Sequence, residues 1–345
     1  MSKGINKALV YKEWINVRWV TLLTIIILFY AKVDGVITEL NHNKTSMRLN
    51  GTVWTDRWFN NGLYVKDVYL YLMLFLVILL AITLFLGEKT SETGGFIASM
   101  PFTRKEIILN KWFVGVVSLL ISFVVTFIIL SLIYLANIND LDIALNPYSD
   151  IVKWFFMDTF QYISIFTFMM FAQSIMGNCI VSSIVGGVVL VVPLFLNSLA
   201  LKYQAIQSTR LFSSKVTKWL CIYMYNITQQ NWVNTESNSG KEMYRTFYYT
   251  NYKSKLLIFF VLTCLFLYLA YVSYKKRNLE YNLRLIVFKN LEPVFIIIIS
   301  ICLGILGGSI FAGESINSFG IWFVVFTIIG YFIFKVLLNV LSKRK

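Results

Sequence analysis

The chain has 345 residues, of which 58% are hydrophobic and only 14% are charged, and its formal net charge is +14. Soluble domains have about a quarter of their residues charged, which excludes water as the main solvent of this chain. The apolar runs are longer than the strands of a membrane barrel. The composition therefore predicts an all-α fold, a polytopic helical bundle in a membrane.

Eight largely uncharged windows approach the roughly 20 residues that cross a bilayer. We expect the shortest, the first, to be lengthened by Arg18 and Lys32, whose long side chains reach toward the headgroups. We place turns at Gly177–Asn178 and at Gly313–Glu314. In chain order the predicted spans are residues 19–31, 68–87, 112–138, 154–176, 179–201, 256–274, 293–313 and 315–334.

The segments between these spans alternate in basic charge. One set comprises residues 1–18, 88–111, 275–292 and 335–345 and holds 17 of the 31 lysines and arginines. The other set comprises segments 32–67, 139–153 and 202–255, which are longer in total and hold fewer basic residues. Because basic residues gather on the cytoplasmic side, we predict that both termini are cytoplasmic and that the second set is extracellular. The residue usage resembles that of an AT-rich genome, and a bacterial plasma membrane is the expected location.

The chemistry of common active sites is missing from the sequence. His42 is the single histidine, so neither a histidine-based metal cluster nor a Ser-His-Asp arrangement can be assembled. Residues 87–90 only superficially resemble the end of a phosphate-binding loop, because the upstream glycine is absent. Asp158 is the carboxylate closest to a span centre, and we expect it to be hydrated or paired beside Lys153. We predict no enzyme activity, no bound cofactor or metal, and no nucleic-acid partner.

The most informative segment is residues 88–111, between the second and third spans. Phe96, Ile97 and Met100 give a short helix an apolar face. Pro101 ends that helix. Thr103 and Glu106 then form a capping-box pattern at the start of the next helix. Such a surface helix can dock into a groove of a partner, although it can equally pack on its own bundle.

This segment resembles the loop of ABC-2 permeases, in which an acidic residue and a small-residue turn precede Ser-x-Pro-x-x-Arg and a lysine. Glu88, Ser99, Pro101, Arg104 and Lys111 match in order and spacing. The resemblance implies that the segment is a coupling helix that touches an ATPase. The coupling residues that it implies are Glu88, Glu92, Phe96, Met100, Pro101, Arg104 and Lys111.

Two other cytoplasmic segments agree with this layout. Residues 1–18 are predicted to form an amphipathic elbow helix, with Tyr11 and Ile15 on its apolar side and Lys12, Glu13 and Asn16 on its polar side. Residues 275–292 are similar to the basic-acidic loop of eight-span members. Arg277 and Glu280 are therefore candidates for a second cytoplasmic contact, with a simple positive-inside anchor as the alternative.

Two further regions have open interpretations. Gly304 and Gly308 in the seventh span let a neighbouring helix approach closely, and we favour a helix of the same chain over another subunit. The aromatic, basic segment 202–255 fits either a small soluble cap or a surface that meets lipid headgroups or an amphipathic cargo.

The resemblance implies a permease subunit of an ATP-driven exporter. Two permease chains, identical or related, would form the path, and a P-loop ATPase in two copies would bind ATP and Mg²⁺. Apolar walls favour an amphipathic or lipophilic cargo, such as a membrane-active or antimicrobial peptide. The alternatives are a membrane-embedded lipid-modifying enzyme and a peptide-sensing accessory subunit.

Overall fold

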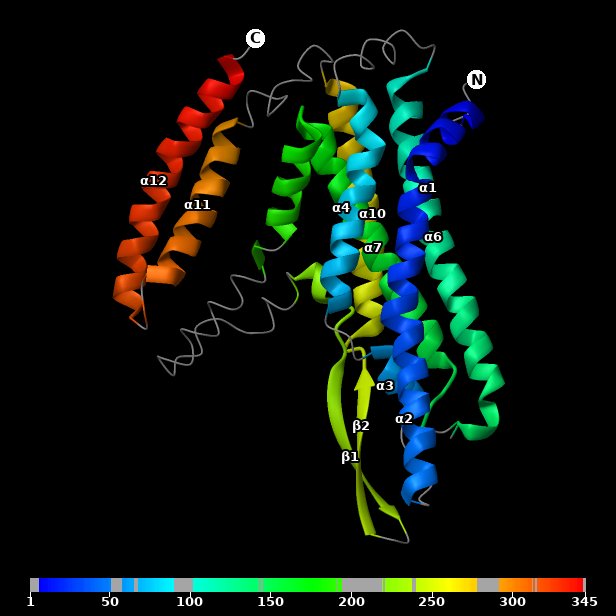
Figure 1. Cartoon of the computed structure of the whole chain (residues 1–345). Helices are drawn as coiled ribbons and strands as arrows, with labels where there is room; N and C mark the ends of the chain where they lie inside the picture. Colours follow the sequence, from blue (N-terminus) through cyan, green and yellow to red (C-terminus); the bar gives the residue numbers. More distant parts are fainter. Residues whose placement is uncertain are drawn as a thin grey trace. The chain divides into compact units, whose positions relative to one another are not determined.

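The computed structural model describes residues 6–50, 58–64, 68–89, 102–141, 143, 145–190, 192–193, 219, 221–237, 240–277, 292–311, 313 and 315–343. Its elements in chain order (Figure 1) are α1 (Lys7–Leu28), the π-helical segment η1 (Phe29–Val33), α2 (Asp34–Asn50), α3 (Trp58–Tyr64), α4 (Val68–Lys89), α6 (Arg104–Ala136), η2 (Ile138–Asp140), α7 (Ser149–Ile175), η3 (Ile222–Met224), β1 (Gln229–Ser237), β2 (Gly240–Tyr248), α10 (Tyr252–Lys276), α11 (Glu292–Phe311) and α12 (Ile316–Lys343).

The helices confirm the prediction of an all-α bundle that crosses a membrane several times. In the described part of the chain, six helical stretches are long and apolar enough to span a bilayer. Two shorter apolar helices, Cys179–Leu190 and Ile296–Phe311, lie where the fifth and seventh spans were predicted. The six spans are Lys7–Thr45, Val68–Lys89, Arg104–Ala136, Ser149–Ile175, Tyr252–Lys276 and Asn317–Val336.

The chain divides into two compact units, and several helices have their two ends in different units. Unit 1 comprises Met1–Leu84, Lys105–Phe168 and Tyr223–Tyr268. Unit 2 comprises Phe85–Arg104, Met169–Ile222 and Leu269–Lys345. Each unit is described by itself below.

The first span of unit 1 is longer than predicted. The sequence places a loop at residues 32–67, but the helix continues from Lys7 to Thr45 and α3 follows it, so this prediction was wrong. Lys32 does not reach for the headgroups: only 5% of it is exposed, and its ammonium donates a hydrogen bond to the Leu63 carbonyl at 3.0 Å. Because protein groups replace water around the ammonium, the helix can continue past Lys32.

The N-terminal helix also differs from a separate amphipathic elbow. Asn6 caps α1 by accepting a hydrogen bond from the Ala8 amide at 2.9 Å, and the helix then runs through Arg18 without a break. Glu13 was predicted on the polar, outward side, which was wrong, because it lies on the buried face with Leu9 and Val17. Its carboxylate is paired with Lys111 of α6.

A β-hairpin lies within the segment 202–255, whose fold the sequence left open. Its strands pair antiparallel from Gln229 opposite Tyr248 to Ser237 opposite Gly240. In unit 1 the hairpin begins next to α3 and extends away from it (Figure 1). The Phe247 amide donates a hydrogen bond to Asn60 Oδ1 at 3.4 Å, which joins β2 to α3. We call this end of unit 1 the hairpin end.

The C-terminal helices of unit 2 form a helical hairpin, with α11 and α12 side by side (Figure 1). Gly313 lies at the turn with φ of 59°, in the left-handed region that favours glycine. A Cβ added to Gly304 would come within 2.0 Å of Thr327 Oγ1, and one on Gly308 within 2.7 Å of the Phe319 ring. Both glycines therefore face α12 of the same chain, and their lack of side chains allows the close approach.

Candidate functional site

The two ends of the predicted coupling segment are described, whereas its middle is not. Glu92, Phe96, Met100 and Pro101 lie outside the described residues. The helix before them, α4, ends at Lys89, and the helix after them, α6, begins at Arg104. The site is therefore built from the residues that flank the segment on these two helices.

In unit 1, Lys111 forms a buried ion pair with Glu13. The two side chains are 2% and 3% exposed, and the lysine Nζ lies 2.9 Å from Glu13 Oε1. Lys111 also donates a hydrogen bond to the Leu84 carbonyl of α4. Both ions are removed from water, so each would be costly to bury without the other. The Lys111 ammonium thereby joins α6 to α1 and to α4.

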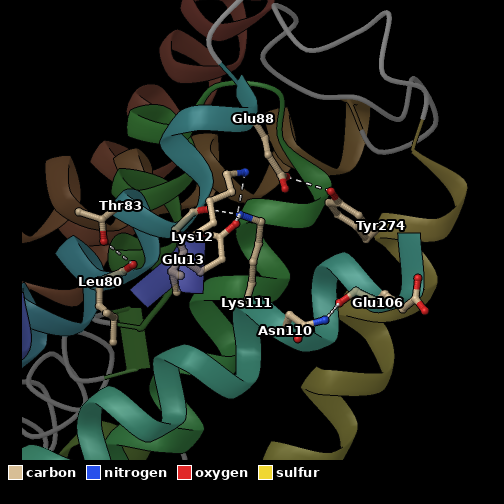
Figure 2. Close-up of polar contacts among 10 residues, drawn as sticks. Lys12, Glu13, Leu80, Thr83, Glu88, Glu106, Asn110, Lys111 and Tyr274 are labelled. Atoms are coloured by element: carbon tan, nitrogen blue, oxygen red, sulfur yellow. Dashed lines mark hydrogen bonds and ion pairs between the residues drawn. The ribbon is translucent and has the colours of Figure 1, made fainter. Parts of the chain in front are cut away.

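A second contact fixes the start of α1 next to the same turn of α6. The Asn6 amide donates to Asn110 Oδ1 at 3.0 Å. The Asn110 side chain in turn donates to the Glu106 carbonyl at 2.6 Å (Figure 2). We call Glu13, Lys111, Asn110 and their partners the Lys111 cluster, and the end of unit 1 that holds it the Lys111 end.

In unit 2, the last residues of α4 are held by other helices. The Tyr274 hydroxyl of α10 donates to Glu88 Oε2 at 2.9 Å, and Glu88 is 6% exposed (Figure 2). The Lys89 ammonium donates to Gln173 of α7, whose amide donates to the Cys179 carbonyl at 3.0 Å. Glu88 and Lys89 are therefore bound within unit 2 by side chains of α10 and α7.

Arg104 and Arg277, which the sequence assigned to two separate contacts, lie together in unit 2. The Arg104 guanidinium donates to the Lys275 carbonyl at 3.1 Å and to the Arg277 carbonyl. Burial lowers the pKa of the Arg277 guanidinium, while nearby Tyr274 and Glu88 oppose this shift. Glu280, the other residue of the second predicted contact, lies outside the described residues.

The placement changes what the predicted coupling residues can do. Glu88 and Lys111 are buried, so their side chains hold helices and do not form an exposed docking surface. Arg104 is half-buried and contacts backbone carbonyls at the end of α10. No group of three or more histidine, cysteine, aspartate or glutamate side chains that could hold a metal ion is found in the part of the chain that the structure describes.

Sequence reasoning missed the polar group at the hairpin end of unit 1. Asp158 is 1% exposed and accepts hydrogen bonds from the Tyr69 hydroxyl at 2.6 Å and from the Trp154 indole at 2.9 Å. Lys153, the partner that the sequence suggested for it, instead contacts Asp150 at 3.3 Å. The available indication was an aspartate inside a predicted span. Such residues are costly to bury, so their presence points to a specific role.

Three of the helices that carry these contacts, α4, α6 and α7, lie in a region that matches a known family. The family model described as ABC-2 family transporter protein matches residues 58–233, about half of the chain. The chain belongs to this ABC-2 transporter family. Neither the curated proteins nor the solved structures contain a significant match. The family assignment makes the chain a membrane-embedded permease of an ABC transporter, a transport subunit that works with an ATPase.

The family match and the polar clusters overlap only in part. Glu88, Arg104 and Lys111 lie inside the matched region, as does the undescribed middle of the coupling segment. Their partners Glu13 and Tyr274 lie outside it. The ABC-2 permease thus ties its family core to its flanking helices through buried polar contacts.

Proposed function

We propose that this ABC-2 permease is the membrane subunit of an ATP-driven exporter. In this proposal a separate P-loop ATPase, present in two copies, binds ATP and Mg²⁺ and docks on residues 88–111. Two permease chains, identical or related, form the path between them. The cargo leaves the cell, and both termini of the permease lie on the cytoplasmic side.

The observation that carries the proposal is the tethering of both ends of the coupling segment. At the first residue of the segment, Glu88 is bonded to Tyr274 of α10; at its last residue, Lys111 is paired with Glu13 of α1. Arg104, at the start of α6, is bonded to the end of α10. An ATPase that moves the segment would therefore also displace α1 and α10, because buried contacts transmit displacement between rigid elements.

An amphipathic or lipophilic cargo, such as a membrane-active peptide, fits the proposal best. The supporting feature is the large number of apolar and aromatic side chains exposed on the spans, among them Trp19, Phe75, Phe260 and Trp322. Exposed side chains of this kind mix with the acyl chains of lipids, and an amphipathic molecule can enter from the same environment.

The test is reconstitution of the permease with the ATPase in liposomes. We expect the two proteins to co-purify and ATP turnover to depend on the permease. Arg104→Gln should uncouple turnover from transport at least severalfold, because α6 then loses its bonds to the end of α10. Lys253→Gln, which removes an exposed positive charge at the other end of α10, is the matched control.

The outcomes separate coupling from folding. Tyr274→Phe removes the hydroxyl that bonds Glu88 and leaves the ring in place. If Arg104→Gln and Tyr274→Phe both assemble with the ATPase and transport like the Lys253→Gln control, the coupling proposal is wrong. Replacing only residues 90–101, which leaves α4 and α6 intact, with a Gly/Ser linker should abolish ATPase binding, and retained binding would place the docking surface elsewhere.

A further inference from the structure

A lysine, two aromatic rings and a carboxylate are buried together at the hairpin end of unit 1. The Lys32 ammonium lies 4.3 Å from the centroid of the Tyr69 ring and 6.0 Å from that of the Trp154 ring. Both rings also hold Asp158, through the Tyr69 hydroxyl and the Trp154 indole N–H. With the Leu63 carbonyl, which accepts from Lys32, these residues form what we call the Lys32 cage.

The carboxylate of the cage has unused capacity for hydrogen bonds. Asp158 Oδ2 accepts from both rings, whereas Oδ1 is buried and accepts no hydrogen bond from the residues that the structure describes. The Asn226 amide also faces this carboxylate and donates to the Tyr162 hydroxyl at 3.3 Å. A buried oxygen with no donor is destabilising, so its retention calls for an explanation.

The cage has the chemistry that recognises an alkylammonium ion. Aromatic faces within about 6 Å attract a cation, and the attraction grows when water is excluded. A carboxylate supplies the counter-charge, and a backbone carbonyl accepts a directed hydrogen bond. Tyr69 serves both purposes, because its ring lies under the ammonium and its hydroxyl bonds the carboxylate.

The backbone that carries Lys32 is wound differently from the helices on either side. Lys32 lies in η1, a single π-helical turn between α1 and α2. Such turns are rare and often mark functional sites. A π-turn holds one more residue than a regular turn of α-helix. If the extra residue shifted from one side of Lys32 to the other, the Lys32 side chain would rotate by about 100°, which is one residue step of an α-helix. The lysine could thus leave the cage while both flanking helices stay folded.

We propose that the Lys32 cage is a recognition site for an alkylammonium group of the cargo, the side chain of a lysine in an amphipathic peptide, and that Lys32 itself occupies the site in this structure. This inference rests on the proposed function, in which the chain exports an amphipathic molecule. Cargo then competes with Lys32 for Asp158 and the two rings, and the π-turn provides the movement that exchanges them.

The first experiment tests the cage in the purified full-length chain, without ATPase or cargo. In Lys32→Ala, n-butylammonium should fill the vacated space and raise the melting temperature, whereas uncharged n-butanol should not. Wild-type protein should respond to neither, because Lys32 is in place. A second variant, Lys32→Ala with Asp158→Asn, should lose the preference for the ammonium. Equal effects of the two probes on Lys32→Ala would overturn the proposal.

A milder variant covers the case in which Lys32→Ala does not fold. Lys32→Gln keeps a donor for the Leu63 carbonyl and removes the charge. Methylammonium should then stabilise Lys32→Gln more than methanol does, and no such difference should appear in Lys44→Gln. Lys44 is the matched control because its side chain is 44% exposed and pairs with Asp140 at the surface. Identical responses of the two variants would also overturn the proposal.

The second experiment measures binding of a lysine-containing amphipathic peptide to the chain in nanodiscs. Lys32→Gln should tighten binding about tenfold, because an internal competitor is removed. An Nε-acetylated version of the peptide should bind both proteins equally, and equal gains for both peptides would overturn the proposal. Failure of the proposed function is distinct: the ammonium effect on Lys32→Ala would persist while reconstituted liposomes transported neither peptide.

Discussion

Lys111 and Lys32 are both buried in unit 1, and their surroundings differ. At the Lys111 end, the ammonium contacts the Glu13 carboxylate directly at 2.9 Å and also bonds a backbone carbonyl. At the hairpin end, Lys32 lies over the ring of Tyr69, and it is the hydroxyl of that ring that bonds Asp158. Each ammonium donates to a backbone carbonyl, but Lys111 adds a close ion pair whereas Lys32 adds the face of an aromatic ring.

The difference teaches how burial of a charge can serve two purposes. Removing one partner of a close buried ion pair strongly destabilises the protein, because the other charge is left unpaired. Such a pair therefore suits a fixed contact between helices. An aromatic face attracts a cation with little directionality, at about 0.5–2 kcal/mol, which suits a cation that is exchanged. We therefore expect the Lys111 cluster to be rigid and the Lys32 cage to be adaptable.

The largest expected effect tests the rigid end. Lys111→Met leaves the Glu13 carboxylate buried without its cation and should cost about 3–5 kcal/mol in the free energy of unfolding. The double variant with Glu13→Gln should recover most of that loss, because no unpaired ion remains. Reversible unfolding in mixed micelles gives the coupling energy through a double-mutant cycle. Additive losses would show that the two residues do not act as a pair.

A smaller effect is expected at the adaptable end. Tyr69→Phe keeps the ring under Lys32 but removes the hydroxyl that bonds Asp158, and should cost about 1–3 kcal/mol. The same unfolding experiment measures it, with Tyr71→Phe on the exposed side of α4 as the control. A loss as large as that of Lys111→Met would make the two ends equally rigid and remove the contrast.

The smallest effect is expected next to the rigid pair. Lys12 lies 3.7 Å from Glu13 Oε1, but its side chain is 41% exposed. Lys12→Met should therefore change the free energy of unfolding by about 0–1 kcal/mol, the range of surface ion pairs. A cost comparable with that of Lys111→Met would mean that Glu13 depends on both lysines.

The sequence was sufficient for the features that depend on long apolar runs. It predicted a helical bundle with several membrane spans, the breaks at Gly177–Asn178 and Gly313, and the family resemblance around Arg104. These features are local, because a bilayer imposes a length on each helix separately. Whether the flanking residues contact an ATPase remains a prediction.

The features that the sequence did not reveal depend on partners far along the chain. Glu13 resembled a solvent-facing residue because Lys111, its partner, is 98 positions away. Lys32 resembled the end of a span because the rings and the carbonyl that solvate it come from other helices. The β-hairpin was indicated only by Asn238 and Gly240, two residues typical of turns.

The separation between Glu13 and Lys111 also concerns how the protein is made. Ribosomes add roughly 5–20 residues per second, so Lys111, which is 98 positions after Glu13, is added roughly 5–20 s later. Glu13 is therefore made well before its lysine, and the ion pair forms only after the start of α6 has been added to the chain. Its place in the second turn of α1 keeps it near the end of the helix, where water can hydrate the carboxylate until α6 enters the membrane.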